Sequence, residues 1–254
     1  MAPEWLAFYD GILALVLASV GVVGAHFGLM SPMFGFSLMF VWAFMLAVIG
    51  SIVGMYARYR YSDPKAVAMR NRATVGVVMS AAVAIPVAIM ALKGMTAGYP
   101  AINDITTDVK SPPEFVHAQL LAGNQDRDMK YDQARYAASQ RAGYGIVAPL
   151  KEKMDPAEAF KRVQEVASQV PVWKVTYIDP ATMTLEGVAV SKIFRFPDDF
   201  IIQVRPAPGG GSLIEMRSKS RYGVGDFGVN HRRISHFFDR MALARGAPQT
   251  EDIP

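Results

Sequence analysis

Cysteine is missing from all 254 residues of the chain. Without a thiol, the chain has no cysteine nucleophile, no cysteine zinc site and no cysteine-bound iron–sulfur cluster. An oxidising compartment permits disulfides without requiring them, so their absence is compatible with a periplasmic location. The location of the protein therefore has to come from other features of the sequence.

Histidine is also scarce, with four residues in the chain. His231 and His236 are five positions apart, so they do not share a helix face as two metal-binding histidines at i and i+4 do. Ser218 and Ser220 do not lie in the G-x-S-x-G turn of a serine hydrolase. The sequence predicts no metal site and no cofactor, and it favours a protein that is not an enzyme.

A large excess of one charge is absent from the later part of the chain. The first 93 residues hold six Lys/Arg and three Asp/Glu, whereas the remaining residues hold 20 and 19. The later charges are mixed and nearly balanced, without the basic stripe that is typical of nucleic-acid binding. We expect no nucleic-acid partner.

Long apolar runs, in contrast, are present near the N-terminus, at Gly11–Met30, Phe34–Tyr56 and Thr74–Leu92. Each is close to the roughly 20 residues that a helix needs to cross the hydrocarbon core of a membrane. None has a charged side chain in its interior. The sequence thus predicts a membrane anchor of three helical spans in residues 1–93.

The loop between the second and third runs predicts the orientation of this anchor. Residues 58–72 contain five basic residues and one acid, Asp63. Positive charge in short loops stays on the cytoplasmic side, so the N-terminus is expected inside and the chain after Lys93 outside. Met1–Asp10 has no basic segment of the kind that opens a cleaved signal peptide. Membrane lipids are expected partners of the anchor.

Small residues recur at four-residue spacing in each predicted span. Such stripes let helix backbones approach closely inside a membrane. They are explained either by packing among the three spans or by docking onto another membrane protein, and the sequence leaves both open. The stripe residues are Gly24, Gly28, Gly50, Gly54, Gly76, Ser80 and Ala84.

The chain after the spans divides into two parts. Residues 94–150 are polar, rich in turn formers and weakly periodic, so they predict an extended arm or linker. In residues 151–254, Asp155-Pro156 predicts the start of a helix, and an amphipathic segment ending near Met241 predicts a second helix. The order favours a small α+β domain with an antiparallel sheet and helices on one face. Four strands are predicted between the helices, at Trp173–Tyr177, Met183–Val190, Phe200–Arg205 and Leu213–Ser220.

Two polar segments of this domain carry a family likeness. Ser191–Asp199 reads SKIFRFPDD, and Arg217–Asn230 reads RSKSRYGVGDFGVN. From about Tyr99 to Met241, the chain resembles the family numbered 1499 among domains of unknown function, whose members pair S-x-I-F-R-F-x-D-D with R-S-x-S-R-x-G-x-x-D-x-G-V-N. That family occurs in bacteria and on chloroplast thylakoids. The resemblance, with the predicted topology, implies a bacterial inner-membrane protein with a periplasmic domain, and it implies no chemistry.

The charged residues of these segments allow a structural interpretation. Alternation places Arg217, Lys219 and Arg221 on one face of the sheet and the two serines between them on the other. Arginines could pair with aspartates and lock the sheet to the last helix, which Asp226 or Asn230 could also cap. The residues of this predicted polar lock are Arg195, Arg217, Arg221, Asp198, Asp199 and Asp226.

Two functional interpretations use the same residues. Asn230 and the arginines could bind a carboxylate, a phosphate or a lipid headgroup at the start of the last helix. Alternatively, Asp198, Asp199 or Asp226 could act as acid or base, but this requires a nucleophile or metal that the sequence does not supply. The residues of the predicted anion site are Arg195, Arg217, Arg221 and Asn230.

Two hypotheses of function follow. In the first, the protein is a non-catalytic accessory or assembly subunit of a larger inner-membrane complex, and its partner is another membrane protein. In the second, it is a stand-alone protein that binds an anionic lipid or small metabolite outside the membrane. The first predicts a stable membrane-protein partner, and the second predicts a pocket with unpaired arginines.

Overall fold

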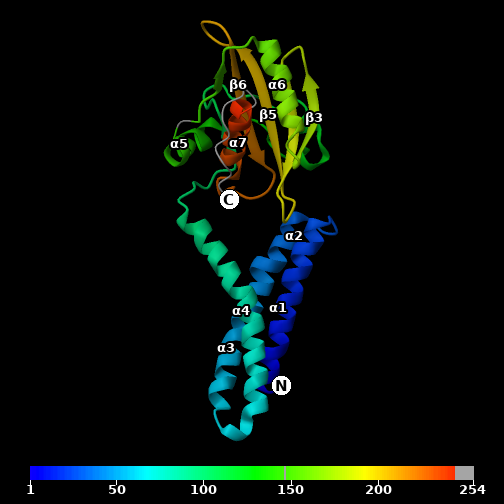
Figure 1. The fold of residues 1–254 in the computed structure, drawn as a ribbon, viewed down its shortest axis with the longest axis vertical. Helices are drawn as coiled ribbons and strands as arrows, with labels where there is room; N and C mark the ends of the chain where they lie inside the picture. The colour runs from blue at the N-terminus through cyan, green and yellow to red at the C-terminus, as the bar shows by residue number, and fades with distance from the viewer. Residues whose placement is uncertain (146, 244–254) are drawn as a thin grey trace. The chain divides into compact units, whose positions relative to one another are not determined.

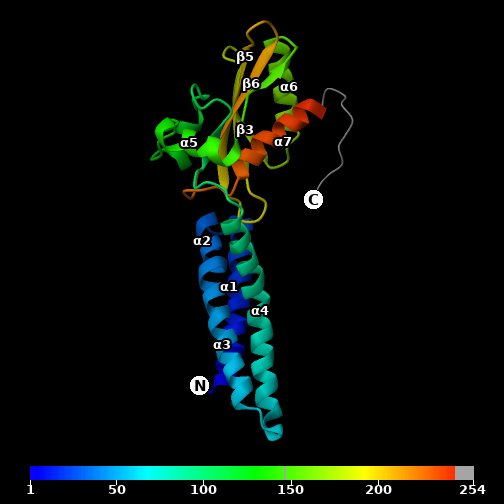
Figure 2. The ribbon, with the colours of Figure 1, turned by 90° about the vertical axis from the view of Figure 1, so that its left-hand side faces the viewer.

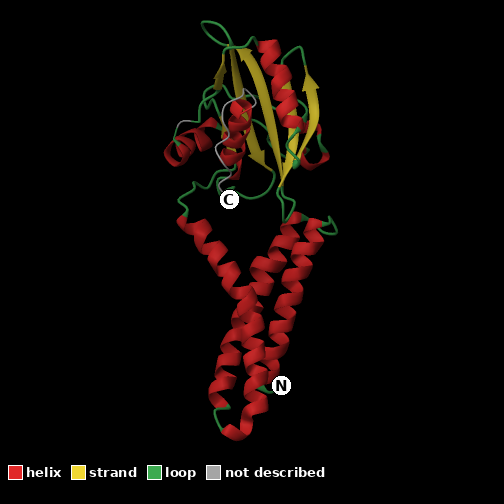
Figure 3. Ribbon diagram, viewed as in Figure 1, coloured by secondary structure: helices red, strands yellow, loops and turns green. Residues whose placement is uncertain are grey.

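The computed structural model of the chain describes residues 1–145 and 147–243. The chain forms two compact units. The first comprises Met1–Ala97 and Lys192–Arg195, and the second comprises Gly98–Ser191 and the described residues from Phe196 onward. Helices make up most of the first unit, whereas the second combines a sheet with helices (Figures 1 and 3). The predicted fold class, three apolar helices and an α+β domain with an antiparallel sheet, is confirmed.

Three helical segments of the first unit are long and apolar enough to cross a membrane. They are α1 (Pro3–His26), a run of α2 (Pro32–Ser37), the π-helical η1 (Leu38–Ala43) and α3 (Phe44–Arg60), and α4 (Val67–Thr96), which the short η2 (Pro64–Ala66) precedes. α1 begins eight residues before the predicted span and therefore contains Glu4 and Asp10. α4 likewise extends the third predicted span at both ends, because helical geometry continues into the flanking polar residues.

Most of the predicted stripe residues pack inside this unit. A Cβ atom built on Gly50 would lie 2.7 Å from Oγ of Ser80, and one built on Gly76 would lie 2.5 Å from the carbonyl oxygen of Ala7. A Cβ on Gly54 would clash with Val77. Ala84 packs against the apolar cluster that joins the helices. The small residues thus allow α1, α3 and α4 to approach one another.

Gly24 and Gly28 have a different role from the predicted one. Gly28 lies beyond the end of α1 with φ of 71°, and the N–H of Leu29 donates to the carbonyl of Gly24 at 2.8 Å. This is the geometry in which a left-handed residue ends a helix. A Cβ on Gly24 would meet the side chain of Met30 in the following turn. The pair therefore shapes the end of α1 and is not a helix-packing face.

The second unit is built on a six-stranded antiparallel sheet in the order β1-β6-β5-β4-β3, with β2 also paired to β6. Its strands are β1 (Asp104–Thr106), β2 (Leu150–Glu152), β3 (Trp173–Asp179), β4 (Thr184–Val190), β5 (Pro197–Pro206) and β6 (Ser212–Ser220). The four predicted strands are present. β1 lies in the segment predicted as an arm, and β2 lies at the boundary between this segment and the predicted domain. The sequence predicts neither strand, because strands of three residues show no measurable periodicity.

The predicted third strand starts earlier than expected. β5 begins at Pro197, so Asp198 and Asp199 lie within the sheet, where they pair with Ser220 and Lys219 of β6. The acids were expected in a loop before the strand, because aspartate is depleted from strands. Their inclusion in β5 depends on the partners described below.

Different layers cover the two faces of the sheet. α6 (Pro156–Ser168) and α7 (Val229–Leu243) lie on the same side (Figure 2), where they enclose the main apolar core with residues such as Phe200, Ile202 and Phe237. On the other face, Ile201 packs with Phe115, Ala118 and Met129. That second layer contains the short helices η3 (Ala118–Leu120) and η4 (Ala122–Asn124), and α5 (Gln133–Tyr144) follows it along the chain.

The N-terminus of α6 forms as the sequence predicts. The Asp155 carboxylate accepts hydrogen bonds from the N–H groups of Ala157 and Glu158 at 2.9 and 3.1 Å. Pro156 occupies the first helical position, where its missing N–H costs no hydrogen bond. The apolar stripe that begins at Phe160 faces the core.

Gly76→Val tests whether the small residues hold the helices of the first unit together. A valine side chain would collide with the backbone of Ala7, so we expect the stability of the unit to fall by about 1–3 kcal/mol, as for an overpacked core. The measurement is thermal unfolding of the full chain in detergent, followed by circular dichroism. Ala88→Val is the matched control, because Ala88 is an exposed small residue of the same helix. Equal midpoints for both variants would contradict the close contact of α1 with α4.

Candidate functional site

The candidate site is built on the end of β6, where charged and small polar residues alternate. Ile201 of β5 is the register partner of Arg217, and Asp199 is the partner of Lys219. Partner residues in antiparallel strands point to the same face, so the cations of β6 lie on the face that carries Ile201. Ser218 and Ser220 point to the other face, toward α7, as the alternation predicts.

Arg217 is fully buried and bound through most of its guanidinium group. Its Nε and Nη2 donate to the two carboxylate oxygens of Asp104 at 2.9 and 2.8 Å. Nη2 also donates to the carbonyl of Met129 at 2.9 Å, and Nη1 to that of Pro113 at 3.3 Å. Lys219 donates to the same Asp104 carboxylate at 2.9 Å. Arg217 thus pairs with an acid of β1 and not with the aspartates that the sequence suggested.

Aromatic rings surround this buried pair. The Arg217 guanidinium lies 4.9 Å from the ring centroid of Phe115 and 5.4 Å from that of Tyr131. Burial, together with the nearby Asp104 carboxylate, raises the pKa of Tyr131 to about 12. The Tyr131 hydroxyl therefore stays protonated even at pH values at which an exposed tyrosine ionises.

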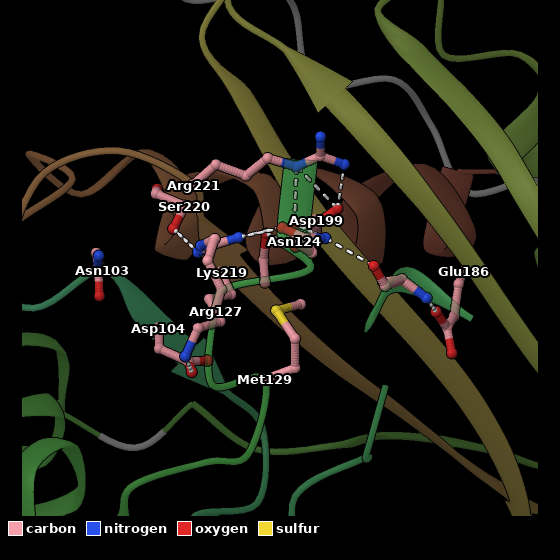
Figure 4. A network of polar contacts seen from close by, with 12 residues as sticks. Asn103, Asp104, Asn124, Arg127, Met129, Glu186, Asp199, Lys219, Ser220 and Arg221 are labelled. Carbon is pink, nitrogen blue, oxygen red and sulfur yellow. Dashed lines mark hydrogen bonds and ion pairs between the residues drawn. The ribbon is translucent and has the colours of Figure 1, made fainter. Parts of the chain in front are cut away.

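Asp199 receives a second group of donors (Figure 4). Arg221 donates to its carboxylate through Nε at 3.0 Å and Nη2 at 2.7 Å. Asn124 and Arg127 reach the same carboxylate at 3.0 and 3.3 Å. Arg127 also donates to the carbonyl of Ser220 at 2.6 Å, so η4 and the residues after it are tied to β6.

The opposite face of β6 contacts α7. The Asn230 side chain accepts from Ser218 Oγ at 2.8 Å and donates to Ser220 Oγ at 2.9 Å. Arg233 pairs with Asp198 and donates to Ser218 Oγ at 2.7 Å. Asp198 and Asn230 thus join the sheet to the last helix, with Arg233 as the cation that the sequence analysis missed.

Asp226 caps α7. Its two carboxylate oxygens accept from the N–H groups of Gly228 and Asn230 at 2.9 and 2.8 Å. This arrangement satisfies backbone donors that a helix start leaves free. The same carboxylate accepts from the Tyr144 hydroxyl at 3.4 Å, and the Tyr144 ring stacks on His231 with centroids 4.7 Å apart.

Glu186 of β4 is a further buried acid that the sequence analysis missed. Its carboxylate accepts from the backbone N–H groups of Val116, His117 and Ala118, at distances down to 2.6 Å. Consecutive N–H groups of this kind form a nest for an anion. Glu186 therefore holds the start of η3 against the sheet through backbone donors, whereas Asp199 holds η4 through the side chains of Asn124 and Arg127.

Arg195, the remaining predicted site residue, belongs to the first unit. It is exposed, and its backbone has φ of 61°. Within the described residues, no carboxylate pairs with it. Arg195 thus belongs to a different unit from Arg217, Arg221 and Asn230.

The network has little capacity for an external ligand. Five buried or half-buried cations share three carboxylates, and Arg127 and Arg217 also donate to main-chain oxygens. A hollow of about 310 Å³ in the described part of the chain lies along α6, and none of the predicted site residues lines it. Chemically, the arrangement joins segments and leaves no cation exposed in a pocket. The residues that sequence reasoning missed are Asp104, Asn124, Arg127, Glu186 and Arg233.

One of these missed residues could have been recognised from the sequence. Glu186 is an acid inside an otherwise apolar strand, and such a residue requires a buried partner. Asp104, Asn124 and Arg127 lie in a weakly periodic segment, where nothing distinguishes them from surface polar residues. Their role depends on contacts between positions about 70 to 115 residues apart, which local patterns do not encode.

Comparison with known proteins identifies one family. The sequence model of DUF1499, described as a protein of unknown function, matches residues 104–241. The match spans the sheet, α5, α6 and most of α7 and begins at Asp104, the acid that binds Arg217. No curated protein matches the chain.

Asp104→Ala tests whether the buried pair supports the second unit. The substitution leaves Arg217 buried without its carboxylate, so we expect a loss of about 3–5 kcal/mol in stability. Hydrogen exchange of the β1 and β6 amides in the full chain measures this loss separately from the helical unit. Asp126→Ala removes an exposed acid of the same unit and is expected to change stability by less than about 0.5 kcal/mol. A similarly small effect of Asp104→Ala would show that the pair is dispensable.

His231 predicts a dependence of stability on pH. Burial, and secondarily Arg232, lowers the pKa of His231 below its ordinary value. The unfolded chain then takes up the proton more readily, so this contribution to stability is present above about pH 6.5 and is lost as the pH falls below it. We expect His231→Phe, which keeps a ring against Tyr144, to reduce the loss of thermal stability between about pH 7.5 and 5.5.

The exposed His236 on the same helix provides the control for this measurement. His236→Phe is expected to leave the pH dependence of the unfolding midpoint unchanged. A pH dependence that survives in the His231 variant would assign the effect to another group.

Proposed function

Because the chain belongs to the DUF1499 family of proteins of unknown function, its role has to follow from its own residues, and we propose that it is a non-catalytic accessory or assembly subunit of a larger inner-membrane complex. Three helices anchor it, and the second unit is an interaction domain on the periplasmic side. The five basic residues in positions 58–72 support this orientation, with the N-terminus in the cytoplasm.

The proposal rests on the charged network, in which the candidate arginines are already paired. Arg217 and Arg221 were the best candidates for binding an anion, and their guanidinium groups are engaged by Asp104 and Asp199. A ligand would have to displace a buried carboxylate, which costs several kcal/mol unless a new partner replaces it. The network therefore supports a rigid domain that interacts with other proteins through its surface. It does not support the alternative of a stand-alone binding protein for an anionic lipid or metabolite.

The position of the acid Asp10 within α1 supports a partner protein inside the membrane. Arg72 lies over the ring of Trp5 at 3.6 Å, and Lys93 follows 21 residues later on α4, which corresponds to about 31 Å of helix. This length is close to the roughly 30 Å of the hydrocarbon core. Trp5 and Arg72 thus mark the cytoplasmic edge of the hydrocarbon core. Asp10 follows Trp5 by five residues, so it lies about 7.5 Å inside this edge.

The described residues offer the Asp10 carboxylate no hydrogen-bond or ion-pair partner. A Cβ built on Gly50 would lie 2.7 Å from Oγ of Ser80 and 3.0 Å from Cβ of Asp10, and the buried Oγ of Ser80 likewise has no partner in the described part of the chain. Polar groups in a membrane are costly and normally pair with another helix or line a polar path. Asp10, which is half-buried, therefore favours a polar contact from a helix of another protein, whereas Ser80 is fully buried within the unit.

Purification of the tagged full chain from its native membranes in a mild detergent tests the proposal. We expect one stoichiometric membrane-protein complex by quantitative mass spectrometry. Asp10→Asn, which keeps the side-chain size, should lower the yield of the partner about three- to twentyfold, as for the loss of about 0.6–1.7 kcal/mol of interhelical polar contact. Asp63→Asn in the exposed loop is the control and should leave the yield unchanged.

The other outcomes are equally clear. A protein that purifies alone with a bound lipid or metabolite would support the alternative function. A protein that purifies alone and empty would contradict a stable subunit. A complex that survives Asp10→Asn unchanged would keep the subunit but exclude Asp10 as a contact.

A further inference from the structure

The connection between β6 and α7 exposes large apolar side chains. Val224 is 68% exposed and Phe227 is 62% exposed, and Tyr222 and Val229 beside them are also exposed. Scattered apolar residues on a surface need no explanation, but a contiguous group indicates a binding surface. We call residues 222–229 the apolar loop.

Phe227 is held in an unfavourable backbone conformation. Its φ is 51°, in the left-handed region that bulky residues avoid, and Gly228 follows with φ of 77°. Such strain costs of order 1–3 kcal/mol and persists where the surroundings impose it. The ring of Phe227 makes no aromatic contact in the described part of the chain, so packing within the protein does not explain why a phenylalanine occupies this position.

The segment that follows the third span holds the apolar loop in place. The Asp226 N–H donates to the carbonyl of Ile102 at 3.1 Å, and the Asn103 side chain donates to the carbonyl of Gly223 at 2.6 Å. A Cβ on Gly228 would lie 2.7 Å from the Tyr99 ring, and Arg232 donates to the Tyr99 hydroxyl at 3.1 Å. Tyr99 and Arg232 are themselves exposed, so a tyrosine and an arginine flank the apolar side chains.

The covalent chain limits how far this loop is from the end of the third span. α4 ends at Thr96, three residues after Lys93, and Tyr99 follows three residues later. The helical part adds about 4.5 Å, and three further residues span at most about 11 Å. Tyr99 touches Gly228, so the apolar loop is within reach of the headgroup layer, which is about 5–7 Å thick on each side of the hydrocarbon core.

We propose that the apolar loop, with Tyr99 and Arg232, contacts the outer surface of the same membrane that the spans cross. Val224 and Phe227 enter the boundary between headgroups and acyl chains, and Tyr99 and Arg232 lie at the headgroup level. Tyrosine and arginine suit this level because each combines an apolar body with a polar end. This inference rests on the membrane anchoring in the proposed function, and it adds a second, lipid-binding contact to the periplasmic domain.

Spin labelling tests this contact directly, because the chain contains no native cysteine. Val224→Cys and Phe227→Cys are labelled in the full chain and reconstituted in vesicles of phosphatidylethanolamine and phosphatidylglycerol. Ile178→Cys, on an exposed position of β3, is the aqueous control, and Ile85→Cys, on an exposed position of α4, is the membrane control. Accessibility to oxygen and to a water-soluble nickel chelate reports the depth of each label.

We expect the ratio of oxygen to nickel accessibility at 224 and 227 to be several-fold higher than at 178 and lower than at 85. Labels at 224 and 227 that are as accessible to nickel as the label at 178 would overturn the proposal. Labels protected from both reagents would also overturn it, in favour of a protein partner at this loop. An aqueous label at 85 would instead contradict the membrane anchoring on which the inference rests.

Phe227→Gly provides a second test that does not depend on a label. Glycine adopts the left-handed conformation without strain, so we expect the second unit to unfold at the same or a higher temperature. The label at 224 should then become more accessible to nickel, because the phenylalanine side chain no longer contributes to lipid contact. A fall in the unfolding temperature would show that Phe227 packs within the chain, which would overturn the argument from strain.

Discussion

The structure of the second unit depends on one buried carboxylate, Asp104, which binds both Arg217 and Lys219. A guanidinium group with no exposed surface has to be paired, because an isolated buried charge would cost far more than a small domain can offset. The pair joins β1, at the edge of the sheet, to β6 near its centre. The donors that Asp104 leaves free reach the carbonyls of Pro113 and Met129, so the same guanidinium also holds the chain that covers this face.

This constraint gives the two faces of the sheet different chemistry. The helix-covered face is mainly apolar, except near the end of β6, where the serines contact Asn230 and Asp198 pairs with Arg233. The other face carries Glu186, Asp199 and Arg217 and is covered by a segment with little regular structure. Directional hydrogen bonds can hold such a segment in one arrangement where apolar packing would allow several. A buried polar network is weak evidence for stability, but it can specify a unique arrangement.

The sequence predicts the features that neighbouring residues determine and misses those that depend on distant contacts. The three apolar helices, the cap at Asp155 and the central strands are encoded by runs, spacing and neighbouring residues, and the structure confirms them. β1, β2 and the start of β5 are not encoded locally, because short strands have no period and aspartates disfavour strands. The likeness of Arg217–Asn230 to a family pointed to the correct region, but the acid that Arg217 requires lies 113 residues earlier in the chain.

Because the interior cations are paired within the fold, the function of the protein has to depend on its surface. In the described residues, Arg217 and Arg221 are paired within the fold, whereas two features that the fold does not explain are an acid in a predicted span and an exposed, strained phenylalanine. Asp10 has no hydrogen-bond or ion-pair partner in the described residues, and Phe227 combines exposure with backbone strain. Natural sequences are locally consistent with their folds except where function requires otherwise. Asp10 and Phe227 are two such exceptions in the described residues, and both are of a kind that a membrane or a membrane partner would satisfy.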